Sequence, residues 1–299
     1  MAVATRTISC ASPVDLRLTL RPLHSAGGLT MRFAAEGVWR ATRTPDGPAT
    51  LHLSGGGTRV DVEAWGAGAA WAVEHAPALV GADDHEDGFE ARHPVVAELR
   101  RRLRGLRVGR SHAVVEALVP TVLEQKVQGV VARRSYARLV RLLGEPAPGP
   151  VPLMLPPEPA RLAALPYDVF HRFNVERKRA QTVRLVGRHA RRLEETTAMR
   201  AGDARRRLRV LPGIGAWTAA EVALVALGDP DAVSVGDYHL PNHVVWALAG
   251  EARGDDARML ELLEPYRGHR GRVIRLVVAG HPGPPRFGPR LPLQSIASY

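Results

Sequence analysis

The hydrophobic pattern of this chain changes its period once, close to residue 92, and this change limits the folds open to it. Before that point apolar and polar residues alternate in short runs, such as 38–41 and 51–53, separated by glycine- and proline-containing turns. Beyond it, apolar residues recur every three to four positions, as on one face of a helix. This spacing predicts helices over 94–104, 111–125, 129–143, 159–165, 176–195, 203–209, 216–227, 238–249 and 256–264. We therefore expect an α+β N-terminal domain (a small antiparallel sheet with a helix) over residues 1–91, followed by an all-α domain over 92–280.

Smaller features divide these two domains further. The alternating run 16–20 predicts another strand, and residues 61–81 have helical spacing. The acidic loop Asp83–Asp87 marks the end of the first domain. A Pro/Gly-rich stretch at 144–157 predicts a long loop, and residues 281–299 are expected to form a loosely held C-terminal tail.

The cysteine content and the lack of long apolar stretches exclude several classes of protein. Cys10 is the only cysteine, so intrachain disulfides, cysteine-rich zinc sites and four-cysteine iron–sulfur clusters are excluded. No stretch approaches the roughly 20 apolar residues of a membrane helix, and the first residues lack the apolar core of a secretory signal. We expect a cytoplasmic protein without membrane contact.

The positive charge of the chain lies in its later two-thirds. Residues 1–90 hold 7 Arg and 11 acidic residues, a net −4, so the +11 of the whole chain leaves +15 for residues 91–299. Such an imbalance favours a polyanionic partner, although a solvated basic face or a coding bias toward arginine would also produce it. Lys126 and Lys178 are the only lysines.

The stretch Leu211–Thr218 predicts a tight hairpin between two helices. Its glycines, Gly213 and Gly215, allow another chain to approach the backbone closely, and the amides that open the second helix form an anion site. Gly213, Gly215, Ala216 and Thr218 are therefore candidate phosphate-binding residues. The alternative is an ordinary glycine-containing turn of a helical bundle.

An extended run over 232–236 leads to Asp237, which stands directly before the next predicted helix. An aspartate at that position is most often an N-cap that accepts backbone N–H bonds. Its place some twenty residues after the hairpin favours a second interpretation, a catalytic carboxylate.

The hairpin, the following aspartate, the β-rich opening domain and the segment Val122–Val127 resemble the DNA-3-methyladenine glycosylase II family, which belongs to the helix-hairpin-helix base-excision glycosylases. The resemblance covers most of the chain. It implies a glycosylase that extrudes a damaged base from double-stranded DNA. In that family's reaction, Asp237 would stabilise the oxocarbenium-like transition state or activate water.

The same resemblance assigns roles to further residues. Trp217 and Tyr238 would stack on an alkylated base, with two core aromatics as the alternative. Gln125 would lie beside the base pocket, and Lys126 would be the wedge that enters the emptied gap, or else a solvated helix-end lysine. Glu221 stands where the family often has an aromatic residue, so it would contact a base edge or lie at the surface, and Val278 stands near an expected tryptophan.

The resemblance also bears on cofactors and on strand cleavage. It implies a monovalent cation held by the backbone carbonyls of Arg209, Leu211 and Ile214, and no other cofactor. Trp217 occupies the place of the lysine that forms a Schiff base in lyase members, which indicates a monofunctional hydrolytic enzyme. His239 and His243 have a zinc-like spacing but lack a third ligand.

We therefore expect a monomeric, nucleoid-associated DNA repair enzyme that acts on alkylated purines. Two alternatives stay open from the sequence. One is a DNA-binding protein that uses the hairpin but catalyses nothing, and the other is a glycosylase for deaminated or oxidised bases.

Overall fold

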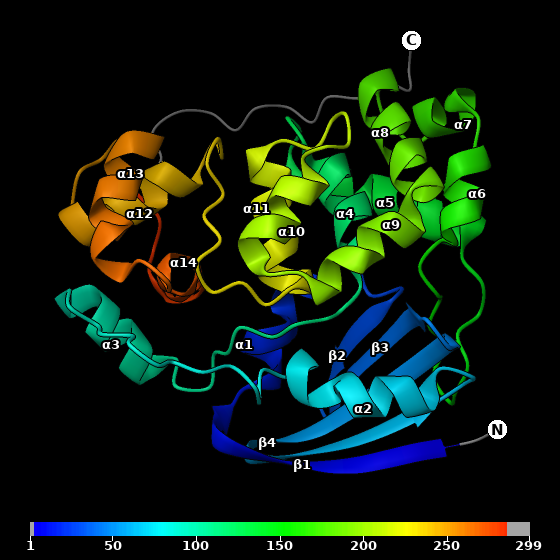
Figure 1. Cartoon of the computed structure of the whole chain (residues 1–299), viewed down its shortest axis with the longest axis horizontal. Helices are drawn as coiled ribbons and strands as arrows, with labels where there is room; N and C mark the ends of the chain where they lie inside the picture. Colours follow the sequence, from blue (N-terminus) through cyan, green and yellow to red (C-terminus); the bar gives the residue numbers. More distant parts are fainter. Residues whose placement is uncertain (1–2, 286–299) are drawn as a thin grey trace.

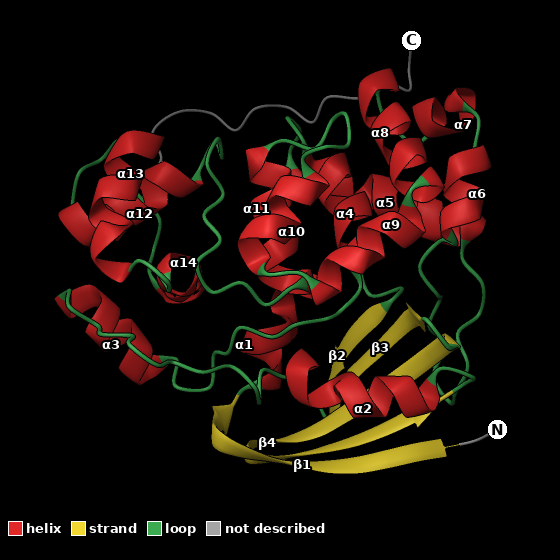
Figure 2. Ribbon diagram, viewed as in Figure 1, coloured by secondary structure: helices red, strands yellow, loops and turns green. Residues whose placement is uncertain are grey.

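A four-stranded antiparallel sheet opens the fold. The computed structural model describes residues 3–285, so residues 286–299 of the predicted tail lie outside the described residues. Strands β1 (Val3–Val14), β2 (Met31–Ala34), β3 (Gly37–Thr44) and β4 (Gly47–Trp65) lie in the order β1-β4-β3-β2 (Figures 1 and 2). The predicted small antiparallel sheet is thus confirmed. Among the described helices, none has the length and apolar character needed to cross a membrane.

Strand β4 bends where the sequence suggested a turn. It pairs with β3 as far as Leu53 and with β1 from Gly57 onward. The intervening glycines have positive φ angles, +84° at Gly55 and +60° at Gly57, which glycine adopts without a Cβ penalty. The triple glycine therefore redirects one strand from one partner to the other instead of ending it.

Two predictions for the first domain were wrong. Residues Leu16–Leu20 form the short helix α1, because Asp15 accepts a hydrogen bond from the Leu18 amide and the buried residues follow helical spacing. The predicted helix over 61–81 is shorter, since residues 61–65 complete β4 and helix α2 runs from Ala69 to Leu79. Helix α2 packs on β1 and β4 and closes the core of the sheet.

The helical part contains two separate hydrophobic cores. The first core belongs to one lobe, whose helices are α4 (Val114–Glu124), α5 (Gly129–Leu143), α6 (Pro159–Ala164), α7 (Tyr167–Arg172), α8 (Arg177–Arg188), α9 (Ala190–Glu194), α10 (Ala201–Leu208) and α11 (Ala216–Ala226). Helix α4 contacts α5, α8, α9 and α11. Helix α7 was not predicted, and the predicted helix over 176–195 divides at His189 into α8 and α9.

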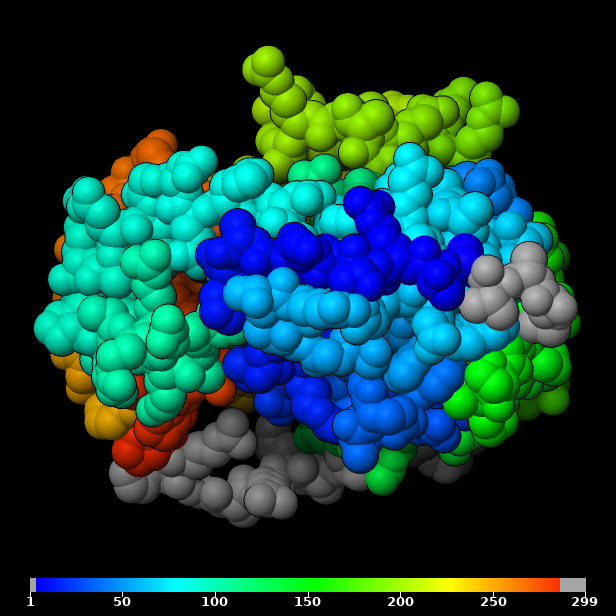
Figure 3. Space-filling view, turned by 90° about the horizontal axis from the view of Figure 1, so that it is seen from below, coloured from blue at the N-terminus to red at the C-terminus, as the bar shows by residue number. Residues whose placement is uncertain are grey.

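The second lobe joins an early helix to the end of the chain. It comprises α3 (Pro94–Arg102), α12 (Leu240–Ala249), α13 (Asp256–Leu263) and α14 (Arg270–Gly280), which share their own core. Helix α14 was not predicted. Seen from below, α3 in cyan-green lies beside the red end of α14, next to the blue N-terminal sheet (Figure 3).

Ion pairs tie these three units together. The fully buried Arg272 of α14 binds Asp84 through both guanidinium NH groups, at 2.8 and 2.6 Å. The acidic loop is therefore an interface as well as a connection. On the other side, Arg40 of β3 pairs with Glu116 of α4 at 3.0 Å. The long loop over 144–157, predicted from its composition, packs against the sheet with Leu153 and Leu155 buried.

Candidate active site

The turn between α10 and α11 is fixed by contacts with two other helices. Gly213 has φ +89°, and a Cβ at this residue would lie 2.1 Å from Oγ1 of Thr182 on α8. Its carbonyl accepts a hydrogen bond from Nε2 of Gln125, at 2.9 Å, at the end of α4. Only glycine fits this position, because of the positive φ and because a Cβ would collide with Thr182. The predicted tight connection between two helices is present.

The N-terminus of α11 is open to solvent. Its N-cap residue is Gly215, which has no side chain to accept from the amides of the first turn. Gly215 and Ala216 are both exposed, and a Cβ on Gly215 would meet no atom within 4 Å. The uncapped amides and the positive end of the helix dipole form a place for an anion. Thr218 lies deeper: it is buried, and its Oγ1 accepts from Gln125 Nε2 at 2.9 Å.

The end of α4 forms a second projecting feature beside this turn. Buried Arg179 of α8 donates to the Leu123 carbonyl at 2.8 Å and holds the end of the helix. Gln125 uses its side-chain amide on Gly213 and Thr218, so it positions the α10–α11 turn. Lys126 follows at the tip of the α4–α5 turn, exposed and with a φ of +57°.

Asp237 is held by three hydrogen-bond donors. Its Oδ1 accepts from the amides of His239 and Leu240 at 2.7 and 2.8 Å. The N-cap residue of α12 is His239, so Asp237 lies two residues before the N-cap rather than at it as predicted, but its side chain still binds the first amides of the helix. Its Oδ2 accepts from the indole Nε1 of Trp217, on α11, at 2.9 Å. The carboxylate thus joins the two helical lobes, and its position and charge are fixed by groups from both.

The two aromatic residues expected to stack on a base have different surroundings. Trp217 is half-buried, its indole donates to Asp237, and it does not line the cleft described below. Tyr238 is 82% exposed, with its ring edge-on to His239 at 4.8 Å. Trp217 is therefore a positioning residue for the carboxylate, a role that the sequence did not indicate.

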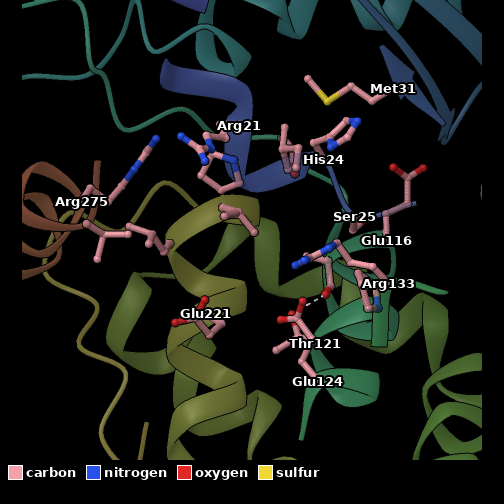
Figure 4. Close-up of a pocket in the computed structure, with 18 of the residues that line it drawn as sticks. Arg21, His24, Ser25, Met31, Glu116, Thr121, Glu124, Arg133, Glu221 and Arg275 are labelled. Atoms are coloured by element: carbon pink, nitrogen blue, oxygen red, sulfur yellow. Dashed lines mark hydrogen bonds between the residues drawn. The ribbon is translucent and has the colours of Figure 1, made fainter. Parts of the chain in front are cut away.

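Asp237 lies on the wall of a cleft of about 730 Å³ where the sheet and the two helical lobes meet. Figure 4 shows the side chains that line it, from the N-terminal domain above to α4 and α11 below. The aromatic rings among its lining residues are those of buried Tyr136 and of three histidines, His24, His239 and His243. Val278, which stands near the tryptophan expected from the family resemblance, also lines the cleft and is 56% exposed.

Three glutamates line this cleft with Asp237, and one of them, Glu116, is paired with Arg40. Glu221 of α11 accepts a short hydrogen bond from Ser234, and burial raises the pKa of its carboxyl. Glu124, the last residue of α4, has its pKa raised to about 7, mainly by burial and then by the Glu221 carboxylate, with Arg133 opposing. Glu221 was predicted to face a base or the surface, and it lies in the cleft. Glu124 was not singled out, although a glutamate ending an apolar helix directly before Gln125 was the available signal.

The carbonyl groups proposed to hold a cation lie in the α10–α11 turn. Within the described residues the carbonyls of Arg209 and Ile214 accept no hydrogen bond from the protein, while that of Leu211 accepts from the Ile214 amide at 3.0 Å. Their free lone pairs fit a monovalent ion. In residues 3–285 no cluster of three or more His, Cys, Asp or Glu side chains could hold a metal, and His243 Nε2 lies 2.9 Å from the His281 carbonyl.

Comparison with known proteins shows which solved structures share this fold. No family model matches the chain, and no curated protein matches its sequence. Its structure is similar to a 3-methyladenine DNA glycosylase from Archaeoglobus fulgidus, with a TM-score of 0.75 and 19% identity over 91% of this chain and 97% of that one. It is also similar to the 8-oxoguanine glycosylase/lyase of Clostridium acetobutylicum bound to double-stranded DNA, with a TM-score of 0.68 and 10% identity over 93% and 96% of the two chains.

A third solved structure matches a smaller part of the chain. The 3-methyladenine DNA glycosylase of Schizosaccharomyces pombe, in complex with abasic DNA, has a TM-score of 0.51 and 14% identity over 64% of this chain and 91% of its own. At these identities the likeness shows a shared fold. The resemblance predicted from the sequence is confirmed at that level, because 3-methyladenine glycosylases are among the structural neighbours.

Proposed function

We propose that this protein is a monofunctional DNA glycosylase that hydrolyses the N-glycosidic bond of alkylated purines in double-stranded DNA. The observation that carries the proposal is the fixation of Asp237, on the wall of the cleft, by the amides of α12 and by Trp217 from the first turn of α11, whose N-terminus is uncapped. The shared fold with DNA glycosylases supports it.

The DNA backbone would bind at the α10–α11 turn, in a helix-hairpin-helix mode. The exposed amides of Gly215 and Ala216 would donate hydrogen bonds to a phosphate, and the positive excess of residues 91–299 would attract the duplex. Lys126, at the tip of the neighbouring turn, would enter the gap left by the extruded base. The carbonyls of Arg209, Leu211 and Ile214 would hold a monovalent cation, which supplies a positive charge for the phosphate.

The extruded base would occupy the cleft, with its sugar near Asp237. Cleavage of the N-glycosidic bond develops positive charge on the sugar, and a fixed carboxylate stabilises it by a few kcal/mol, on the order of 3. Water then adds to the sugar carbon, and Asp237 orients it or accepts its proton. Trp217 and the α12 amides keep the carboxylate in place before the substrate arrives.

The positions of the lysines support hydrolysis without strand cleavage. A lyase step needs an amine that attacks the sugar to form an imine. Lys126 and Lys178 are exposed, neither lines the cleft, and Trp217 occupies the position after the hairpin. Borohydride should therefore trap no covalent complex on a lesion duplex. Trapping that disappears in Lys126→Ala would overturn the monofunctional assignment.

The central test is base release from a panel of duplexes. Each would carry one lesion, 3-methyladenine, 7-methylguanine, hypoxanthine or 1,N6-ethenoadenine, and alkali would then cleave the abasic sites formed. Release of the methylated purines is the expected result. Tight binding of the duplexes without release of any base would refute the proposal and favour a DNA-binding protein.

A further inference from the structure

The four carboxyl groups that line the cleft differ in how much of their hydrogen-bonding capacity the protein uses. Asp237 accepts from three donors, and Glu221 accepts from Ser234. Glu116 accepts from Arg40, from the Thr42 hydroxyl and from the Arg43 amide. Glu124 lines the same cleft, but its carboxyl accepts no hydrogen bond from any residue in the described part of the chain. It is only partly buried by the protein, so its carboxyl remains accessible from the cleft. Of the four, Glu124 is the group free to contact a bound base.

We propose that Glu124 is the general acid of the reaction and protonates neutral purines as they leave. This inference rests on the proposed glycosylase function and extends it to a substrate class. Asp237 and Glu124 would then divide the work, one carboxylate stabilising the sugar and one carboxylic acid serving the base, from α12 and α4 on the walls of a single cleft.

The step balances as a simple hydrolysis. The bond between the sugar carbon and purine N9 breaks, and its electron pair goes to the purine. The proton of the Glu124 carboxyl passes to a ring nitrogen of that purine, which leaves as a neutral molecule. Water forms the new bond to the sugar carbon and loses a proton to Asp237 or solvent. Solvent then returns the proton that Glu124 gave up.

The surroundings of Glu124 keep part of the population protonated at neutral pH. Its pKa is raised to about 7, mainly by burial and then by charge repulsion from Glu221 and Asp237, while Arg133 of α5 lowers it. Figure 4 shows Glu124, Arg133 and Glu221 on the helices that enclose this part of the cleft. Three histidines also line the cleft: His239 and His243 of the α12 region, and His24, whose pKa is lowered mainly by burial and then by Arg133.

The proposal separates two classes of substrate by their need for an acid. A neutral base such as hypoxanthine leaves poorly unless it gains a proton. A cationic base such as 7-methylguanine already carries the positive charge that makes it leave, and further protonation would add a second charge. Glu124 should therefore matter for the first class and not for the second.

Single-turnover release of hypoxanthine and of 7-methylguanine by Glu124→Gln is the direct test. The variant should release hypoxanthine about a hundredfold more slowly, since a general acid contributes that much or more, and 7-methylguanine within about threefold of the wild type. Glu98→Gln is the matched control, because it removes an exposed glutamate from α3, away from the cleft. Equal losses on both lesions, or no loss on hypoxanthine, would overturn the role of Glu124.

The pH profile supplies a second readout. Wild-type release of hypoxanthine should fall as the pH rises above about 7, whereas the Glu124→Gln profile should be flat. Glu221→Gln should move the wild-type midpoint to lower pH, because a neighbouring negative charge is lost, and an unchanged midpoint would contradict the proposal. A wild-type protein that releases neither base would refute the proposed function itself, a result distinct from equal losses in the variant.

Discussion

The N-termini of α11 and α12 lie next to each other, but only that of α12 has a side chain that accepts from its first amides. Both begin with backbone amides that have no partner within the helix. At α12 the chain supplies its own anion, since Asp237 accepts from the amides of His239 and Leu240. At α11 the N-cap is Gly215, which supplies none. One helix end is capped by a side chain of the protein, and the other is open to solvent.

Two helix N-termini can therefore differ in chemistry, depending on whether a side chain caps them. A filled helix end produces a fixed negative charge, which suits the stabilisation of a cation in the cleft, while an open end produces an anion site. A third helix N-terminus, that of α4, is also capped by a carboxylate, and this cap has a structural role only. At the start of α4, Glu194 accepts from the amides of Val114 and Val115 at 2.9 and 2.8 Å, away from the cleft lining.

The largest effect is expected from neutralising the filled end. Asp237→Asn keeps an oxygen for the α12 amides but removes the charge and turns an NH₂ group toward Trp217. Base release should slow by about a hundredfold or more, with lesion-duplex affinity retained. Single-turnover rates and binding titrations measure the two separately. Near-normal release would remove Asp237 from the reaction and reduce it to a cap.

Filling the open end should give the next largest effect. Gly215→Asp places a carboxylate at the N-cap of α11, where the backbone is extended and a Cβ meets no atom within 4 Å. The helix should gain about 1 kcal/mol of stability from the new cap, while affinity for all duplexes falls about tenfold. Gly215→Ser, a neutral cap, is the matched control. Selective loss for a single lesion would place Gly215 in the base pocket instead.

Removing the contact between the two helix ends should have a smaller effect. Trp217→Phe keeps the ring but deletes the N–H that donates to Asp237 Oδ2. We expect kcat to fall about fivefold with little change in KM, because a positioning hydrogen bond contributes about 1 kcal/mol. In the Asp237→Asn background the same substitution should have no further effect. A rise in KM alone would indicate that the indole contacts the base.

The smallest effect is expected at the structural cap, in the pH dependence of stability. Burial raises the pKa of Glu194 to about 7 in the folded protein, despite the two amide hydrogen bonds. The folded state therefore binds more protons than the unfolded state between about pH 4.5 and 7. The contribution of Glu194 is present at low pH and is lost as the pH rises through 7.

Thermal unfolding of Glu194→Gln checks this expectation. Between pH 5 and pH 8 the wild-type Tm should fall by a few degrees, roughly 3, more than that of the variant. Only the slopes are compared, since glutamine also replaces one acceptor by a donor. Parallel slopes would show that Glu194 is ionised throughout and behaves as an ordinary carboxylate cap.

The sequence predicted the elements that carry local signals. The glycines of the α10–α11 turn and the aspartate before α12 are short-range patterns, and both were located correctly. Helix α14 was missed for a physical reason: Arg272 and Arg275 occupy buried positions that a hydrophobic period treats as polar. Arg272 is accommodated by Asp84, and Arg275 donates to the carbonyls of Arg107, Leu18 and Thr19. Those partners are distant in sequence, so no local sequence pattern predicts that these arginines are buried.

The candidate site shows the same limit. Asp237 could be chosen from its position, but the bond from Trp217 joins two helices from different lobes and appears only in three dimensions. An aromatic residue beside a predicted pocket suggests stacking, whereas the indole N–H decides what it does here. Glu124 gains its significance from burial and from the carboxylates opposite it, neither of which is visible from a glutamate at a helix end.

The pairing of α3 with the C-terminal helices also sets the order in which the molecule can be completed during synthesis. Asp84 and Arg272 are 188 residues apart, so on the order of ten to forty seconds separate their translation. The core of the first helical lobe needs no residue beyond Ala232, so that lobe and the sheet can form while the ribosome is still at work. The apolar face of helix α3 stays exposed to solvent until α14 has been synthesised and packs against it. A nascent chain therefore has its α10–α11 turn before the segment that carries Asp237 has packed against the second lobe. Under the proposed function, its phosphate-binding site would form before its catalytic site.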